Sequence, residues 1–493
     1  MNTTQELKTQ WTNPADILSI LLLLGGDIVQ KSIAQLVGHK ISFPTHTSSG
    51  LSVAPVTFSF GWAAYAFQNL LAVVGDMRLM PAVDFPSIVV NCANGFARET
   101  QSWVLGRLLR DHEIRCDADK PSQTNGSYSK SIQIDVFNLE PVPRSPESDF
   151  LCWLGWATIA TQTIIAVLPW ALYDDLGVLA ITLAGNLLAA ITCALPQWTQ
   201  EKWAAPKLKS EKVICLTRGN GHHYAMVLIC APGSWDLEKM ATGRVTARPE
   251  TRWISLVLAL LWTCILISVS GLKEHTWFLV GIGALGMLQN AFAAGTSRRP
   301  SASMFNITRF SRAPRIIGGY QSYKDDLEDA ANLEEAAQDI ADIDQWASQK
   351  QAIGQHIQQS AGATVKVMPI WLASMSKEDG VPGWLEPPKP QKGREPRIRT
   401  RSWFKTEDGR SEEIIFADGG IHGALIELEK WVPTAGLAMV QTFFPAGLKY
   451  NDVSIRDNVH KKFWRRAYHT VSVRKRAEVK RRAIGRAYSS AVV

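Results

Sequence analysis

Charged residues are absent from five long windows of this 493-residue chain. A bilayer core about 30 Å thick requires about 20 apolar residues of helix to cross it. One such helix fits in the core of a soluble protein, but five argue against a soluble protein. We therefore predict membrane-spanning helices at 51–75, 150–173, 176–200, 253–272 and 276–297.

A sixth span is predicted over 15–37, although this segment is not free of charge. Asp27 and Lys31 follow its apolar run and lie four positions apart, so on a helix they face each other and can pair. The residues before the run lack the basic region of a signal peptide, and no small-residue cleavage site follows it. We therefore expect a first span stabilised by an Asp27–Lys31 pair.

Lysine and arginine are scarce in every second connection between these windows and abundant in 77–149, 197–252 and 297–315. Basic loops remain in the cytoplasm, so six spans place all of them, and both termini, on the cytoplasmic side. Three glycosylation sequons fall on that side, and we predict that they stay unmodified: Asn2, Asn125 and Asn306.

The predicted fold class is mainly α: a polytopic helical membrane protein with cytoplasmic loops, one β-hairpin and a long cytoplasmic C-terminal tail. Pairs of spans are separated by soluble segments. The predicted organisation is a cytoplasmic N-terminus at 1–14, spans within 15–76, 150–200 and 253–297, cytoplasmic loops at 77–149 and 201–252, and a tail at 298–493.

Two soluble loops carry local signals. Apolar residues at helical spacing from Val89 to Leu109 predict a surface helix, which lies in the membrane interface or packs on the other loops. In 213–230, two apolar runs flank Asn220-Gly221, which supplies the positive φ angles of a type I′ hairpin turn. With this turn at the centre, Cys215 is expected opposite Met226.

The tail changes composition several times. Residues 324–346 are acidic and alanine-rich, which predicts a solvated helix, and 376–412 have the composition of a linker. Residues 419–447 predict two short helices separated at Pro433. The basic segment 461–486 contains aromatic side chains and predicts binding to anionic lipid, with a solvated tail as the alternative.

Motifs that carry chemistry are missing. His222-His223 invites a metal or acid–base interpretation, but a metal site needs three or four ligands, and no HExxH, CxxC pair or HxxxH accompanies the two histidines. There is no Walker A sequence and no Gly-x-Ser-x-Gly. We therefore predict no metal, no cofactor and no catalytic residue. Membrane anchoring also argues against nucleic acid as a partner.

Small and amide residues occur inside the predicted spans. Gly281, Gly283 and Gly286 match a nucleotide-binding pattern, but no strand precedes them, so helix packing is the better interpretation. Gly185 and Ala189 fit the same role. The amide side chains fit either interhelical hydrogen bonding or a transport pathway: Gln68, Asn69, Gln162, Asn186, Gln289 and Asn290.

Four stretches together carry a family resemblance: DILSILLLLGGDIVQK at 16–31, SWVLGRLLRD at 102–111, CLTRGNGHHYAMVLI at 215–229 and GIGALGMLQNAFAAG at 281–295. The chain resembles an uncharacterised family of fungal multi-pass membrane proteins. The resemblance implies a membrane protein and transfers no catalytic or binding residue. Some proteins of this kind are encoded beside genes of specialised metabolism.

The function expected from these features is a non-enzymatic membrane scaffold or accessory protein. Soluble segments make up more than half of the chain, which suits work at a membrane surface. The expected partners are the lipid bilayer, anionic lipid at the C-terminus and proteins on the cytoplasmic side. Two alternatives remain: a transporter of small solutes or metabolites, and a membrane-bound enzyme that uses His222 or His223.

Overall fold

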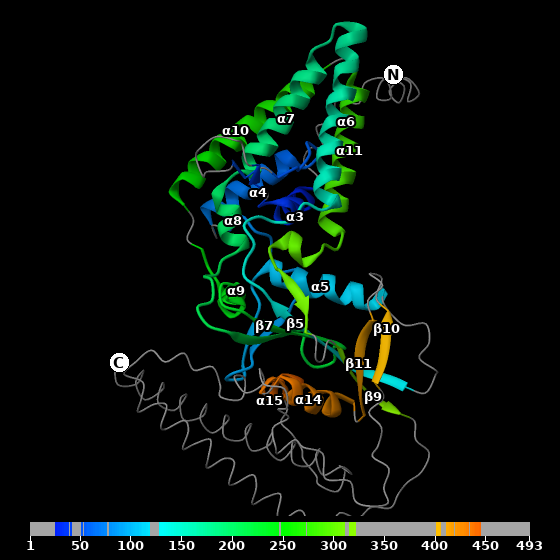
Figure 1. Cartoon of the computed structure of the whole chain (residues 1–493). Helices are drawn as coiled ribbons and strands as arrows, with labels where there is room; N and C mark the ends of the chain where they lie inside the picture. The colour runs from blue at the N-terminus through cyan, green and yellow to red at the C-terminus, as the bar shows by residue number, and fades with distance from the viewer. Residues whose placement is uncertain are drawn as a thin grey trace, which may run out of the picture.

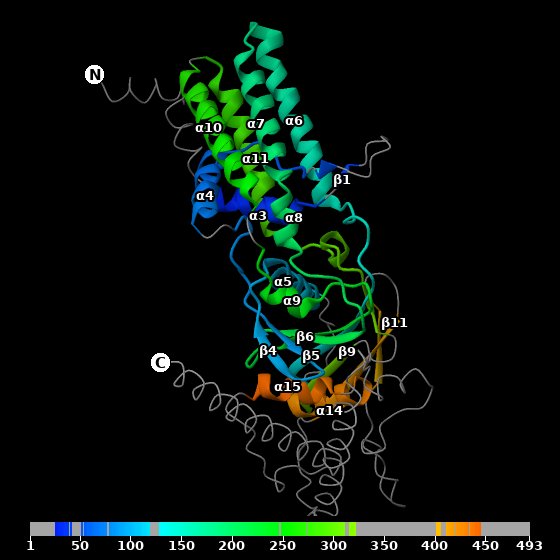
Figure 2. The same cartoon turned by 90° about the vertical axis from the view of Figure 1, so that its left-hand side faces the viewer.

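A helical bundle stands on one face of a mixed β-sheet (Figures 1 and 2). The predicted helix 324–346, the basic segment 461–486, Asn2 and Asn125 lie outside the residues that the structure describes. The computed structural model describes residues 25–38, 40–41, 51–52, 54–75, 78–118, 128–245, 248–272, 274–310, 315–321, 401–405, 411–418, 420–432 and 434–444.

Four long helices form two hairpins that extend away from the sheet: α6 (Phe150–Tyr173) with α7 (Gly177–Cys193), and α10 (Pro249–Gly271) with α11 (Thr276–Gly295) (Figure 1). At 1.5 Å per residue, α6 and α10 are each about 35 Å long. After a bend of 47°, α7 is followed by α8 (Pro196–Lys202). Among the described residues, α6, α10 and α11 are long and apolar enough to cross a membrane, and α7–α8 is a fourth if the bent pair counts as one span.

The two N-terminal windows are not the continuous helices that we predicted. In 51–75, residues 54–61 are non-helical, and α4 (Trp62–Val74) begins only after Gly61 at φ 96°. In 15–37, α3 (Gly26–Leu36) begins after Gly25 at φ 86°. Both glycines adopt a left-handed conformation that other residues rarely take, so the helix cannot continue backwards through them.

The sheet joins segments that lie far apart in the sequence. Among the described residues its strand order is β10-β11-β9-β5-β7-β6-β3-β4, with β8 also paired to β5. β5 is parallel to β7 and β9 is parallel to β11, whereas the other pairs are antiparallel. The strands are β3 (Ile88–Asn91), β4 (Phe96–Glu99), β5 (Tyr128–Leu139), β6 (Lys212–Thr217), β7 (Tyr224–Cys230), β8 (Ile307–Arg309), β9 (Arg315–Gln321), β10 (Arg401–Lys405) and β11 (Ser411–Asp418).

Both faces of the sheet are covered. On the side of the bundle lie α5 (Trp103–Ala118) and α9 (Leu237–Thr242), and on the opposite side lie α14 (Gly420–Trp431) and α15 (Ala435–Phe443) (Figures 1 and 2). Successive side chains of a strand point to opposite faces. Two apolar clusters therefore form, one between the sheet and α5 that continues into the bundle, and one between the sheet and α14–α15.

Three predictions for the soluble segments need correction. The predicted surface helix runs over β3 and β4, and only α5 is helical. The hairpin prediction is wrong by one residue, because Cys215 lies opposite Val227. Its turn spans 218–223 with positive φ at Gly219 and Gly221, so Asn220-Gly221 is not a two-residue type I′ turn. Part of the predicted linker 376–412 forms β10.

Candidate functional site

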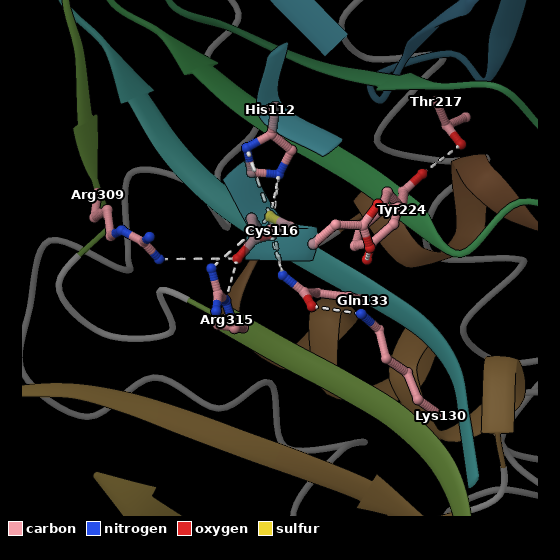
Figure 3. A network of polar contacts seen from close by, with 10 residues as sticks. His112, Cys116, Lys130, Gln133, Thr217, Tyr224, Arg309 and Arg315 are labelled. Carbon is pink, nitrogen blue, oxygen red and sulfur yellow. Dashed lines mark hydrogen bonds and ion pairs between the residues drawn. The ribbon is translucent and has the colours of Figure 1, made fainter. Parts of the chain in front are cut away.

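A buried cluster of polar side chains lies between α5 and the sheet (Figure 3). His112 and Cys116 stand one turn apart on α5, so both side chains point to the same side of the helix. Gln133 and Asp135 alternate with Ile132, Ile134 and Val136 along β5, which directs the two polar side chains toward α5. The helix and the strand therefore place four polar groups in one buried space.

Asp135 is the centre of this cluster, and its side chain is 1% exposed. Its Oδ2 lies 3.0 Å from His112 Nε2, 3.4 Å from Cys116 Sγ and 2.7 Å from Gln133 Nε2. Cys116 Sγ is also 3.4 Å from His112 Nε2 and 3.3 Å from Gln133 Nε2. One nitrogen, one sulfur and one carboxylate oxygen thus converge within hydrogen-bond distance of one another.

Arg315 compensates the buried charge of Asp135. The two residues are directly opposite on β9 and β5, and Arg315 Nε donates to Asp135 Oδ1 at 2.7 Å. Burial alone would raise the pKa of Asp135, but the nearby Arg315 guanidinium and the His112 hydrogen bond hold it well below its usual range. Asp135 is therefore an anion in the folded chain.

The cluster continues from Gln133 toward the N-terminal end of β5. Lys130 Nζ donates to Gln133 Oε1 at 2.8 Å and lies 4.3 Å from the centre of the Tyr224 ring. The Tyr224 hydroxyl donates to Asp117 Oδ1 at 2.5 Å. These contacts fix the Gln133 amide against Asp135 and Cys116 (Figure 3).

Nucleophilic catalysis is not what this arrangement favours. A thiolate needs a low pKa, whereas burial, and then the charge of Asp135, raises the pKa of the Cys116 thiol far above its ordinary value. In a catalytic triad the imidazole uses one nitrogen for the nucleophile and the other for the acid. Here His112 Nε2 faces both Cys116 and Asp135. Nitrogen, sulfur and carboxylate oxygen are instead the donor types that bind zinc in proteins.

Four of the predicted intramembrane amides surround the 54–61 segment inside the bundle, whereas Asn69 donates to Ser255 Oγ at 3.5 Å and Gln68 is exposed. Gln162 Nε2 donates to Phe58 O at 2.7 Å, and Phe58 N donates to Asn186 Oδ1 at 3.0 Å. Asn290 Nδ2 donates to Thr57 O at 3.1 Å, and Thr57 Oγ1 donates to Gln289 Oε1 at 3.0 Å. These amides satisfy backbone and hydroxyl groups that have no helical partner.

Most of the predicted packing glycines also face the 54–61 segment. A Cβ on Gly185 or Gly283 would overlap the ring of Phe58 or Phe60, and one on Gly286 would overlap the carbonyl group of Phe58. Gly281 has no neighbour in its Cβ position. Ala189 is fully buried on α7. The small residues thus make room for a non-helical segment in the bundle.

Asp27 and Lys31 do not form the predicted ion pair among the described side chains. Asp27 is exposed in the first turn of α3, and no ion pair within 4.0 Å joins it to Lys31. The free amide groups of a helix N-terminus favour a carboxylate without a lysine partner. Asn306, the one sequon described, donates from Nδ2 to Glu140 Oε2 at 2.8 Å.

His222 and His223 lie in the turn between β6 and β7, outside the buried cluster. His223 is exposed, and its Nδ1 is 2.9 Å from Ser131 O. Desolvation and then the Arg218 charge lower the pKa of His222. Within the part of the chain that the structure describes, metal-ligating residue types instead meet at His112, Cys116 and Asp135.

A second polar region joins the bundle to the sheet domain. Arg107 Nη1 of α5 donates to Ala294 O in the last turn of α11 at 2.8 Å. The Arg298 guanidinium donates to both carboxylate oxygens of Asp149 at 2.7 and 2.8 Å and also to Gln35 O. Cations at helix C-termini satisfy the last carbonyl groups. We call the contacts of Arg107 and Arg298 the junction.

The residues of the buried cluster were not among those predicted from the sequence. Two signals were present: a histidine and a cysteine at i and i+4, and two polar residues at alternate positions within an otherwise apolar strand. The comparisons with known proteins add nothing to these signals, because no protein-family model, curated protein or solved structure matches the chain.

Proposed function

We propose that the chain is an integral membrane scaffold or accessory protein, in which the helical bundle holds the α/β domain in a fixed orientation at the cytoplasmic surface. The observation that carries this proposal is the reversed polarity of the bundle. Large apolar side chains point outward from all four long helices, among them Trp253 at 72%, Leu288 at 71% and Leu260 at 60% exposure. Amide side chains point inward.

Water would disfavour such a surface, whereas lipid accommodates it. The 54–61 segment also fits a membrane environment, since non-helical backbone within a membrane must be enclosed by protein, and the bundle encloses this segment. Gln162, Gln289 and Asn290 are bonded to that segment, which is a packing role. The bundle interior therefore favours an anchor over the transporter alternative.

We infer the side of the membrane from the distribution of charge. The basic loops 77–149 and 197–252 both carry strands of the sheet, which lies at one end of the bundle (Figure 2). The connections between α6 and α7 and between α10 and α11 lie at the other end and are short. This arrangement supports a cytoplasmic α/β domain, because basic loops remain inside.

Leu260→Lys tests the membrane proposal. In a bilayer, a lysine near the centre of α10 opposes insertion by about 2.5–3.5 kcal/mol, so the variant should lose resistance to alkaline extraction from membranes. Phe150→Lys is the matched control, because Phe150 is 68% exposed at the end of α6, where a lysine reaches the headgroups. A Leu260→Lys protein that inserts and accumulates like wild type would contradict the proposal.

A further inference from the structure

We propose that His112, Cys116 and Asp135 form a structural zinc site that fixes α5 to the sheet. The inference rests on the buried cluster alone and does not depend on the membrane scaffold. The three donor atoms, Nε2, Sγ and Oδ2, are separated by 3.0, 3.4 and 3.4 Å.

These separations fit one tetrahedral ion. Zinc lies about 2.0–2.1 Å from nitrogen, 2.0–2.2 Å from oxygen and 2.3 Å from sulfur, so two ligands of a tetrahedral ion are about 3.3–3.8 Å apart. The separations in the cluster differ from this range by about 0.3 Å or less. An ion placed above the triangle of donors is bound after side-chain shifts of a few tenths of an ångström, without movement of α5 or β5.

The donor types select the class of metal. Imidazole nitrogen together with thiolate sulfur suits zinc, whereas magnesium and calcium prefer oxygen ligands alone. The other oxygen of Asp135 accepts from Arg315 Nε at 2.7 Å, which orients the carboxylate so that Oδ2 faces the metal position. Partners of this kind, bonded to a ligand rather than to the ion, are typical of protein zinc sites.

Gln133 supplies the fourth ligand. Its amide nitrogen is next to two of the three donors, 2.7 Å from Asp135 Oδ2 and 3.3 Å from Cys116 Sγ. A half-turn of the amide turns its oxygen toward the metal position and its nitrogen toward Lys130. Lys130 then gives up its hydrogen bond to Gln133 and keeps its contact with the Tyr224 ring. Binding replaces the thiol proton of Cys116, which is released to solvent as the metal–thiolate bond forms.

The site would strengthen the part of α5 that carries the junction. Arg107 lies on the same helix as His112 and Cys116 and binds the end of α11. A zinc ion between α5 and β5 therefore ties the bundle, the helix and the sheet into one unit. Its role is structural, because four protein ligands leave no position for a substrate.

The experiment uses the full-length chain, purified in detergent without a histidine tag or chelator. We expect about one zinc per chain by elemental analysis. After zinc is exchanged for cobalt, we expect a near-ultraviolet charge-transfer band from sulfur to cobalt. Cys116→Ser should abolish the band and weaken zinc binding more than about 100-fold, which is beyond the effect of losing a group outside the ligand shell. Cys230→Ser is the control, since Cys230 is a buried cysteine on β7.

The zinc content and cobalt spectrum of the wild-type protein test the proposal even if Cys116→Ser fails to fold. A folded wild-type chain that carries no zinc and develops no cobalt–sulfur band on titration would overturn the proposal. Zinc bound equally well by wild type and Cys116→Ser would also overturn it, because the metal would then lie elsewhere. Loss of the band in Cys116→Ser with retention in Cys230→Ser would support it.

Discussion

Asp135 is a buried carboxylate whose negative charge is compensated chiefly by one cation, Arg315. Arg315 is 6% exposed and donates directly to it, while Arg309 Nη1 is more distant at 3.9 Å. Removing one partner of a buried ion pair leaves an uncompensated charge in a medium that solvates it poorly. The stability of the sheet domain should therefore respond strongly to this single contact.

We expect Arg315→Met to lower the free energy of unfolding by about 3–5 kcal/mol. Thermal unfolding in the presence of a metal chelator measures this effect without any contribution from bound metal. The double variant Asp135→Asn/Arg315→Met should recover more than half of the loss, because it buries no charge. Equal losses in the single and the double variant would show that the ion pair is not the cause.

Glu238 should make the stability of the sheet domain sensitive to acid. Its carboxylate lies 2.6 Å from Lys212 Nζ, 2.8 Å from Asn91 Nδ2 and 3.1 Å from Arg98 Nε, so it joins α9 to three strands. Burial alone would raise the pKa of Glu238, but these donors, Lys212 first, hold it below its usual value. The folded state therefore favours the ionised form.

A depressed pKa contributes stability above the pKa of the unfolded chain, about 4.3, and this stability is lost as the pH falls toward the folded value. We expect Glu238→Gln to lower stability by about 1 kcal/mol at pH 7 and by much less near pH 3. Unfolding measured across that range tests the expectation. Glu250→Gln provides the control, because Glu250 is an exposed residue at the start of α10, outside this network.

Sequence could predict little at the residue scale, because the site combines distant positions. The spacing of His112 and Cys116 is visible locally, but Asp135 and Arg315 join them only after β5 and β9 pair. A lone histidine and cysteine on a helix are common in ordinary cores. Pairing of these strands depends on tertiary contacts, which the local pattern does not contain.

At the scale of elements, the 54–61 segment replaces a helix that composition alone predicts. Long helices were predictable where apolar composition continued without interruption: the window 150–173 coincides with α6, and 276–297 nearly coincides with α11. In 51–75 the charges are equally absent, but Pro55 removes a backbone donor and Gly61 turns the chain. Hydropathy does not distinguish a buried helix from a buried non-helical segment.

The apolar spacing of residues 88–99 misled in a similar way. Val89 and Phe96 lie seven positions apart, as on one face of a helix, but they belong to two strands with a turn at 92–95. A strand, a turn and a strand can imitate helical spacing over a short window. The pairing of β3 with β6, more than 100 residues away in sequence, decides the structure.

Gly286 and Gly281 give a matched test of the segment's packing. We expect Gly286→Ala to lower the free energy of unfolding by about 1–3 kcal/mol, because its Cβ would overlap the backbone of Phe58. Gly281→Ala should raise stability by up to about 1 kcal/mol, because its Cβ position is open and alanine favours helix. Effects of the same sign and size would contradict this packing.

At the scale of the whole molecule, the junction decides whether the bundle and the sheet domain act as one body. Arg298 is buried between Asp149, before α6, and Gln35, at the end of α3. The backbone N–H of Arg298 also donates to Asp111 of α5 at 2.9 Å. One residue thus links two helices of the bundle with the helix that covers the sheet.

We expect Arg298→Met to separate the unfolding of the two parts. Wild type should show one transition, whereas the variant should lose the sheet domain at a lower temperature than the bundle. Hydrogen exchange of β5 and α10, followed during heating, measures the two parts independently. Arg299→Met is the control, because the neighbouring Arg299 is exposed. A single shared transition in Arg298→Met would show that other contacts couple the parts.

The order of strands in the sheet has a consequence for folding during translation. β5 is central, but its partner β9 is translated about 180 residues later, after both helical hairpins. At about 5–20 residues per second, β5 waits about 10–35 s for that partner. During this interval one edge of the strand is open to pairing with other chains. Production of the folded protein should therefore depend on elongation rate and on chaperones that occupy the nascent chain between synthesis of β5 and β9.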